Sequence, residues 1–295
     1  MLKIALPSGE MLSPTLDLFQ KTRIGVTRKL PRQFDVRFSG ISILDRGWIE
    51  KSVDIPRDVA SGEFDVGIAT LDLILEAQAR VVMCADLQFN RATTGRPTEV
   101  VLYCRRGRKL KGAEQVPHGS IVCSEFPNLT RRFFKERGRR VVVIPSRGST
   151  ESLIARKGGF GVSLREKGGT LDDNDLKVVE RMVRSGTFLI ANQKAFRDSR
   201  KGPQIAHLTR LLKGTVSARD SLMLEMNVPK DRLKAVLAAL PKREGQSPDI
   251  QQLADPTWVS VTYLVQTGEF NDLEDKLYRI GARSIVAGAE ETVIP

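Results

Sequence analysis

Residues 120–144 read SIVCSEFPNLTRRFFKERGRRVVVI, and this stretch indicates the fold of the chain. Short apolar runs at 120–123 and 140–144 flank a segment in which Pro127 and Asn128 suit the first turn of a helix. A strand, a helix and a second strand in this order make up the unit from which parallel sheets are built. We therefore expect α/β layers, with both strands in one sheet.

The start of this helix carries groups that suit an anion. The first backbone N–H groups of a helix are unpaired and its dipole is positive there, and Arg131 and Arg132 follow within one turn. An ordinary surface helix could have the same residues, so both interpretations stay open for the stretch alone. A second polar loop, at 146–150, precedes the acid Glu151. Ligands of open α/β sheets bind beyond the carboxyl ends of strands, where both loops should lie.

The composition limits the class of protein. With 295 residues, 41% of them hydrophobic, the chain can form two or three domains with separate cores. We expect no membrane span, because no run approaches about 20 apolar residues. We expect a cytoplasmic location, because residues 1–4 lead directly into a strand pattern. Three widely spaced cysteines favour buried free thiols, and two histidines argue against a histidine metal cluster.

The net charge of +12 suggests anionic ligands. Basic clusters occur at 105–109 and 137–140, but aromatic residues that could stack on bases are not interleaved with them. A positive field would equally attract polyphosphate substrates to an enzyme. We therefore expect no nucleic acid among the partners.

The last third of the chain has a different pattern. Its order of elements, βαββαβ, is that of a ferredoxin-like domain. The expected strands are 221–226, 250–253, 258–265 and 284–287, and the expected helices are 230–240 and 270–280.

Motifs spread along the chain resemble one known family. They are IALP at 4–7 with Gly9, DIP at 54–56, DVGI at 65–68, PNLTRR at 127–132, Gly148-Ser149 with Glu151, LIAN at 189–192, MNVP at 226–229, and Trp258-Val259 ahead of Gly281-Ala282. In this order they resemble ATP phosphoribosyltransferase in its long form, with a regulatory C-terminal domain, over nearly the whole chain. The resemblance implies a two-lobed fold like that of periplasmic binding proteins: lobe I at 1–95 and 177–208, lobe II at 96–176, and the ferredoxin-like domain at 209–295.

The resemblance also implies a reaction and its participants. N1 of ATP would attack C1 of phosphoribosyl pyrophosphate and release pyrophosphate, in the first step of histidine biosynthesis. Mg²⁺ would bind the leaving group, histidine would inhibit through the C-terminal domain, and the long form would be a homohexamer. Such a transfer depends mainly on positioning and charge stabilisation, with little acid or base from the protein.

Site residues are carried over by resemblance. Two carboxylates, Glu151 and Glu166, are the candidate catalytic residues, and no metal ligand of the protein is expected. The candidate substrate- and phosphate-binding residues are Ser8, Asn128, Thr130, Arg131, Arg132, Ser149, Lys167, Gly168, Gly169 and Thr170.

Three positions depart from the family pattern. The family usually has Lys-Gly-Arg after its first Leu-Pro, where this chain has Ser8-Gly9-Glu10, and an acid of the phosphoribosyl loop has become Val162. Losing two cations weakens the binding of phosphate. Three hypotheses remain. The chain is a transferase with altered loops, or it is a divergent paralogue with another acceptor or no catalysis, acting as a nucleotide-binding regulatory subunit. The third is a nucleic-acid binder of the same fold, which the lack of interleaved aromatic residues disfavours.

Overall fold

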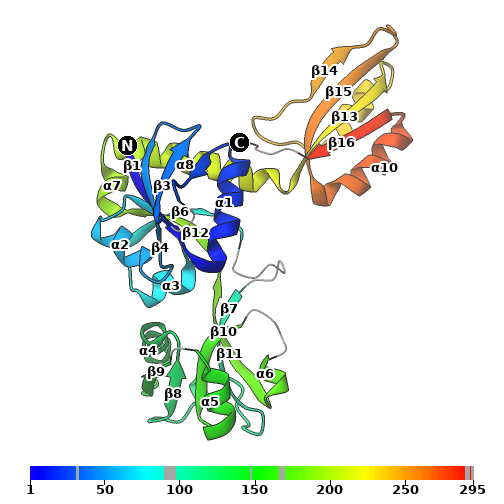
Figure 1. The fold of residues 1–295 in the computed structure, drawn as a ribbon. Coiled ribbons are helices and arrows are strands. Elements are labelled where there is room, and N and C mark those ends of the chain that lie inside the picture. Colours follow the sequence, from blue (N-terminus) through cyan, green and yellow to red (C-terminus); the bar gives the residue numbers. More distant parts are fainter. Residues whose placement is uncertain (31–32, 90–97, 147, 166–169, 290–292, 294–295) are drawn as a thin grey trace. The chain divides into compact units, whose positions relative to one another are not determined.

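The chain forms two compact units, Met1–Thr209 and Arg210–Pro295. This computed structural model describes residues 1–30, 33–89, 98–146, 148–165, 170–289 and 293. Unit 1 contains two α/β lobes, and unit 2 is a smaller α/β domain (Figure 1). The division between the units lies beside the domain boundary at 208/209 that the sequence suggests. No helix within the described ranges is long and apolar enough to cross a bilayer.

Lobe I is built on a seven-stranded mixed sheet with the order β2-β3-β4-β1-β5-β12-β6. The strand expected at the N-terminus is β1, whose Leu2, Ile4 and Leu6 are fully buried on one face. It runs parallel to β4 and β5, whereas β12 runs antiparallel to β5 and β6. The strands are β1 (Leu2–Pro7), β2 (Gly25–Thr27), β3 (Asp35–Ser39), β4 (Leu44–Glu50), β5 (Val66–Thr70), β6 (Val81–Asp86) and β12 (Thr187–Asn192).

Helices cover this sheet closely. A β-carbon at Gly67 would lie 2.8 Å from methyl groups of Ile55 and Val59, so glycine lets α2 approach β5. Ser13 lies inside the first turn of the first helix, because a 3-10 turn at Gly9–Met11 leads straight into that helix. The helices of unit 1 are α1 (Leu12–Lys21), α2 (Ile55–Ser61), α3 (Leu71–Glu76), α4 (Pro127–Glu136), α5 (Thr150–Lys157), α6 (Thr170–Asp173) and α7 (Gln193–Arg197), and α8 (Lys201–Ala218) runs past its end.

Lobe II contains the predicted strand, helix and strand unit. Its five-stranded sheet has the order β11-β7-β10-β8-β9, in which β10, β8 and β9 are parallel. Phe134 of α4 packs on one face, whereas Ile154 of α5 packs beside Tyr103 on the other. The strands are β7 (Thr98–Arg105), β8 (Ile121–Ser124), β9 (Val142–Pro145), β10 (Phe160–Arg165) and β11 (Leu176–Ser185).

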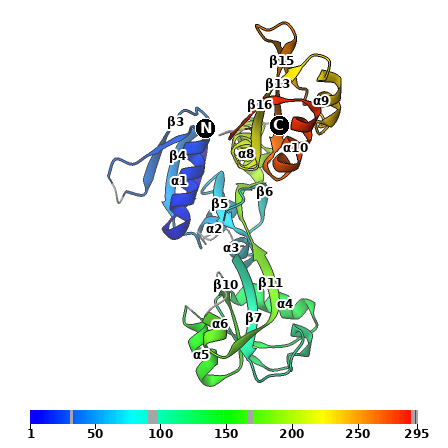
Figure 2. The same cartoon turned by 90° about the vertical axis from the view of Figure 1, so that its right-hand side faces the viewer.

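Two crossings join the lobes. The first runs between β6 and β7, and the lobe boundary expected at 95/96 lies outside the described residues. The second is at Gly186, later than the expected boundary at 177. The difference arises because β11 stays paired with β7 along its length, up to Ser185 opposite Thr98, as Figure 2 shows.

Unit 2 has the expected ferredoxin-like topology. Its antiparallel sheet has the order β14-β15-β13-β16, and both helices pack on one face around Val261 and Leu277. The elements are β13 (Ser221–Pro229), α9 (Leu233–Ala239), β14 (Asp249–Gln252), β15 (Trp258–Gln266), α10 (Phe270–Ile280) and β16 (Arg283–Ala289). The order βαββαβ read from the sequence is thereby confirmed.

Candidate active site

Two loops of lobe II lie at one edge of its sheet, because each follows a parallel strand that ends there. Ser124 at the end of β8 pairs with Pro145 at the end of β9, so these two strand ends lie level, and it also pairs with Val162 of β10, which continues to Arg165. The expectation that the loops after residues 124 and 145 share an edge is confirmed. The loop after β10 holds Glu166, Lys167, Gly168 and Gly169, which lie outside the described residues; Thr170 is described only as the start of α6.

Glu151, a candidate catalytic acid, lies in the first turn of α5 at this edge. The hydroxyl of Ser163 on β10 donates a hydrogen bond of 2.5 Å to its Oε1 atom. Tyr103 lies on the neighbouring strand β7, and its Oη is buried without a hydrogen-bond partner among the described residues. Burial raises the pKa of Tyr103, and the charge of Glu151 raises it further. Glu151 is therefore half-buried and held in one orientation by a strand.

A second acid, Glu125, lies at the same edge and was missed by sequence reasoning. Thr150 Oγ1 lies 3.4 Å from its Oε1 and 2.9 Å from Ser146 Oγ, which links the loops after β8 and β9. Glu125 lies two residues after the end of the expected strand 120–123, and that position was the available signal. Ser149 directly precedes α5 with a φ of 56°, and its side chain makes no capping bond.

The N-terminus of α4 is not open to phosphate, because Glu76 of α3 fills it. The Glu76 carboxylate accepts hydrogen bonds from the backbone N–H of Asn128, at 3.0 and 3.1 Å, and of Leu129, at 2.9 Å. The Asn128 side chain donates to the Glu76 carbonyl at 3.1 Å. A phosphate could take this position only if Glu76 moved away.

The other candidates on α4 have separate environments. Thr130 is fully buried, and its hydroxyl lies 2.8 Å from that of Ser124. Arg132 forms an exposed ion pair of 3.7 Å with Glu136. Arg131 donates to the Asn128 side chain at 3.1 Å and is exposed. The structure thus separates residues that the sequence motif groups together.

Ser8 lies at the carboxyl end of β1, as expected for a residue of a ligand-binding edge. Its N–H donates to the Glu50 carbonyl at 2.8 Å, and its own carbonyl accepts from the Ser52 hydroxyl at 3.2 Å. The Ser8 side chain makes no capping bond to the 3-10 turn that follows, in which Glu10 is exposed. An acid therefore faces solvent beside this strand end.

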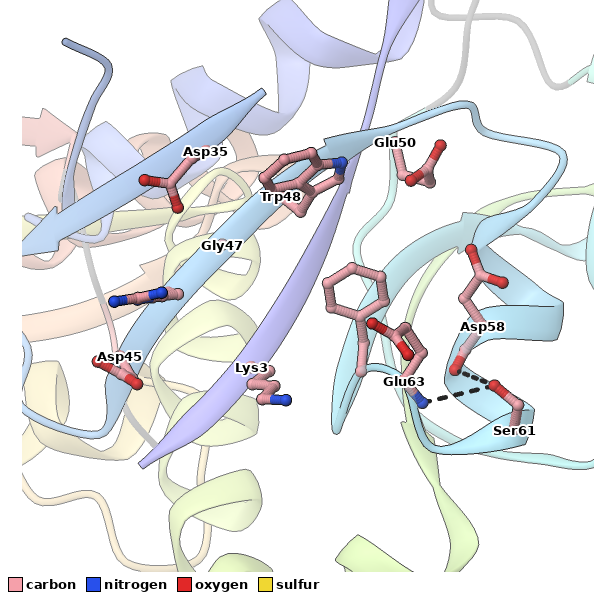
Figure 3. Close-up of a pocket in the computed structure, with 11 residues that line it drawn as sticks. Lys3, Asp35, Asp45, Gly47, Trp48, Glu50, Asp58, Ser61 and Glu63 are labelled. Carbon is pink, nitrogen blue, oxygen red and sulfur yellow. Dashed lines mark hydrogen bonds between the residues drawn. The ribbon is translucent and has the colours of Figure 1, made fainter. Parts of the chain in front are cut away.

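A pocket of about 600 Å³ opens on the α2 side of the lobe I sheet (Figure 3). None of the candidate site residues lines it. Burial and the charges of neighbouring acids raise the pKa of Asp58 within it. Five acids and two bases contribute to its wall, so it does not suit a polyphosphate; the lining residues are Lys3, Asp35, Asp45, Arg46, Gly47, Trp48, Glu50, Asp58, Ser61, Glu63 and Phe64.

Comparisons with known proteins identify the family. The family model for ATP phosphoribosyltransferase (HisG) matches residues 51–214, and that for the HisG C-terminal domain matches residues 218–289. The chain belongs to the ATP phosphoribosyltransferase family. The identification from sequence motifs, as a long-form member of this family of histidine biosynthesis, is confirmed, and so is the enzyme class of phosphoribosyl-transferring enzymes.

Individual relatives agree with the family match. The ATP phosphoribosyltransferase of Pelotomaculum thermopropionicum is 31% identical over 295 residues, which cover 100% of this chain and 99% of the relative. That of Methanothermobacter thermautotrophicus is 30% identical over 308 residues, with the same coverage. A solved ATP phosphoribosyl transferase (HisG:HisZ) complex from Thermotoga maritima matches with a TM-score of 0.60 and 22% identity, over 73% of this chain and 98% of that one. This last likeness supports the fold.

Proposed function

We propose that the chain transfers the phosphoribosyl group of phosphoribosyl pyrophosphate to ATP at the carboxyl edge of the lobe II sheet. The N1 lone pair of ATP forms the new bond to C1, while the bond from C1 to the pyrophosphate oxygen breaks and pyrophosphate leaves with its electron pair. The observation that carries the proposal is the 2.5 Å bond from Ser163 to Glu151, beside the edge where the parallel strands β8 and β9 end.

Glu151 would act through its charge and its position. A carboxylate with a fixed orientation can accept hydrogen bonds from ribose hydroxyls and stabilise the positive charge that develops at C1. Ser163 uses its hydroxyl to hold the carboxylate, so little reorganisation is needed when charge develops. Glu125, linked through Thr150, could bind a further substrate hydroxyl. Glu166, Lys167 and the turn at 168–170 remain candidates by resemblance.

Mg²⁺ fits this site as an ion that arrives with a substrate. No group of three or more His, Cys, Asp or Glu side chains suited to a metal occurs in the described part of the chain. Mg²⁺ is commonly held by substrate phosphates together with one or two carboxylates. Glu125 and Glu151 could supply those carboxylates, and the ion would neutralise charge on the leaving pyrophosphate.

Glu151→Gln tests the proposal, with Glu136→Gln as the matched control. Glu136 is an exposed acid of the same lobe that pairs with Arg132. We expect pyrophosphate release to fall about 100-fold or more in Glu151→Gln, the usual loss when one preorganised electrostatic group is removed. The control should keep the wild-type rate. Wild-type protein that releases no pyrophosphate with ATP, phosphoribosyl pyrophosphate and Mg²⁺ would overturn the proposal.

A regulatory subunit that binds nucleotide without catalysis is the second candidate. Two observations favour it: Glu76 fills the N-terminus of α4, and Ser8 and Glu10 stand where the family usually has cations. Such a protein would bind ATP in calorimetry with no Mg²⁺-dependent binding of phosphoribosyl pyrophosphate. The transferase predicts both.

We also propose that the chain forms a homo-oligomer, a hexamer by resemblance, and that histidine inhibits it through unit 2. Light scattering would give the number of subunits. Histidine should inhibit the full chain and should bind less tightly when the active site is loaded with substrate, because coupling between two sites is reciprocal. Histidine that leaves both the rate and substrate affinity unchanged would exclude this role.

A further inference from the structure

A basic pocket lies on the α4 side of lobe II, beyond the end of the helix that is opposite Glu76. It has a volume of about 490 Å³, within the range of small-molecule sites, and no acidic residue lines it. It is formed by the second half of α4 and the turn that leads into β9. The lining residues are Arg131, Lys135, Gly138, Arg139, Arg140 and Val141, which we call the basic pocket.

The cations of α4 and of the turn that follows it form two groups. Arg132 pairs with Glu136 at 3.7 Å, and Arg137 pairs with Glu180 at 2.7 Å and stacks on an aromatic ring. The four cations of the basic pocket have no carboxylate within 4.0 Å in the ranges that the structure describes. Positive charge is therefore neutralised around the pocket and left unneutralised inside it.

Capping of the helix does not account for these cations. Basic side chains often bind the last carbonyls of a helix, but backbone groups already do so here. The N–H of Gly138, which has a φ of +65°, donates to the Lys135 carbonyl at 3.0 Å, and the N–H of Arg139 donates to the Phe134 carbonyl at 2.8 Å. This pair of bonds is a Schellman motif. Arg137 adds a bond of 3.3 Å from its side chain to the Phe133 carbonyl.

The backbone that carries the pocket is held in place. The N–H of Arg140 donates to His118 Nδ1 at 3.3 Å, and its carbonyl accepts from the N–H of Gly119 at 2.8 Å. At the other side of the pocket, the Arg131 side chain donates to Asn128 Oδ1 at 3.1 Å. Groups that are already positioned lose less freedom when a ligand binds, which favours affinity.

We propose that the basic pocket binds a small polyphosphate, through a diphosphate or triphosphate group that is free or attached to a nucleotide. Arginine forks and a lysine suit phosphate oxygens, and four cations match the charge of such a group. No aromatic side chain lines the pocket, so the phosphates and not a base are recognised. Arg131 then serves this pocket and not the substrate edge.

The test is a calorimetric titration of the full chain with inorganic triphosphate, followed by ATP. Lys135→Ala/Arg139→Ala removes two cations of the pocket. The control, Lys234→Ala/Arg279→Ala, removes the same charge from exposed positions of α9 and α10 in unit 2. We expect the pocket variant to bind triphosphate at least 10-fold more weakly than wild type, and the control to stay within about 2-fold.

The activity assay separates this site from the proposed active site. At saturating substrates the pocket variant should release pyrophosphate at the wild-type rate, while Glu151→Gln should keep wild-type triphosphate binding. The proposal is overturned if wild-type protein does not bind triphosphate, or if both double variants weaken its binding equally. Triphosphate binding that is lost in Glu151→Gln and kept in the pocket variant would place triphosphate at the substrate edge and also overturn the proposal.

Discussion

Glu76 and Asn128 are joined by two hydrogen bonds from one N–H to both carboxylate oxygens, at 3.0 and 3.1 Å. Through them α3, which follows a strand of lobe I, caps α4, the helix that follows β8 in lobe II. Leu73, one turn earlier on α3, is buried in the same core as Phe134 of α4. The N-terminus of α4 therefore anchors lobe II to α3, using the groups that would otherwise suit an anion.

Glu76→Ala should lower the free energy of unfolding. It removes charge-assisted hydrogen bonds to two backbone N–H groups and the favourable interaction with the helix dipole, a loss of about 1.5–3 kcal/mol. Urea unfolding measures the change, and Asp17→Ala, at an exposed acid of lobe I, is the control. If phosphate binds here after displacing Glu76, the variant should also bind inorganic phosphate more tightly. Unchanged stability would mean that the cap contributes nothing.

The helix at 127–136 could be predicted from its own residues, but its cap could not. Pro127 and the apolar spacing of Leu129, Phe133 and Phe134 are local signals. Glu76 lies 52 residues before Asn128, and no local pattern relates the two. A helix with a short hydrophobic period can be recognised from its own sequence, whereas a contact between two residues far apart in the chain cannot.

Burial of Thr130 had a signal in the sequence that the motif obscured. Thr130 precedes Phe133 by three residues and Phe134 by four, so it belongs to the buried face of the helix. The expected boundary at 177 differs from the crossing at Gly186 for a related reason, since hydrophobic spacing locates β11 but does not say which sheet it joins. The ferredoxin-like order of unit 2 was recovered because each of its elements follows a clear turn.

Thr130→Val tests the structural role of this side chain. The variant keeps the shape of threonine but removes the partner of the Ser124 hydroxyl, so the free energy of unfolding should fall by about 1–2 kcal/mol. Binding of phosphoribosyl pyrophosphate, measured by calorimetry, should not change. Thr130→Ser keeps the hydroxyl and is the control. If Thr130 contacts substrate phosphate instead, the valine variant should bind substrate more weakly and the serine variant should not.

Asp58→Asn should stabilise the protein near neutral pH. Burial, and then the charges of Glu50, Asp54 and Glu63, raise the pKa of Asp58 above its ordinary value of 3.8. A raised pKa means that the folded state disfavours the charged form, so ionised Asp58 costs stability above that pKa. The advantage of asparagine should disappear as the pH falls below about 3.8. Asp17→Asn, on the exposed side of α1, is the control, and a gain that persists at pH 3 would refute the electrostatic cause.

Tyr103→Phe should change the response of stability to alkaline pH. Burial, and then the charge of Glu151, raise the pKa of Tyr103 above its ordinary value of 10.0. The folded state therefore holds the phenol proton more tightly than the unfolded state does, and this contribution to stability is complete below pH 10 and lost as the pH rises beyond it. Wild-type protein should lose free energy of unfolding more steeply above pH 10 than Tyr103→Phe does.

Near pH 7 the variant should be at least as stable as wild type, because it removes a buried hydroxyl without a partner in the described part of the chain. Tyr278→Phe removes a phenol that is 54% exposed and should follow the wild-type curve. Equal slopes for wild type and Tyr103→Phe would show that Tyr103 ionises as readily in the folded protein as in the unfolded chain, and that Glu151 does not act on it.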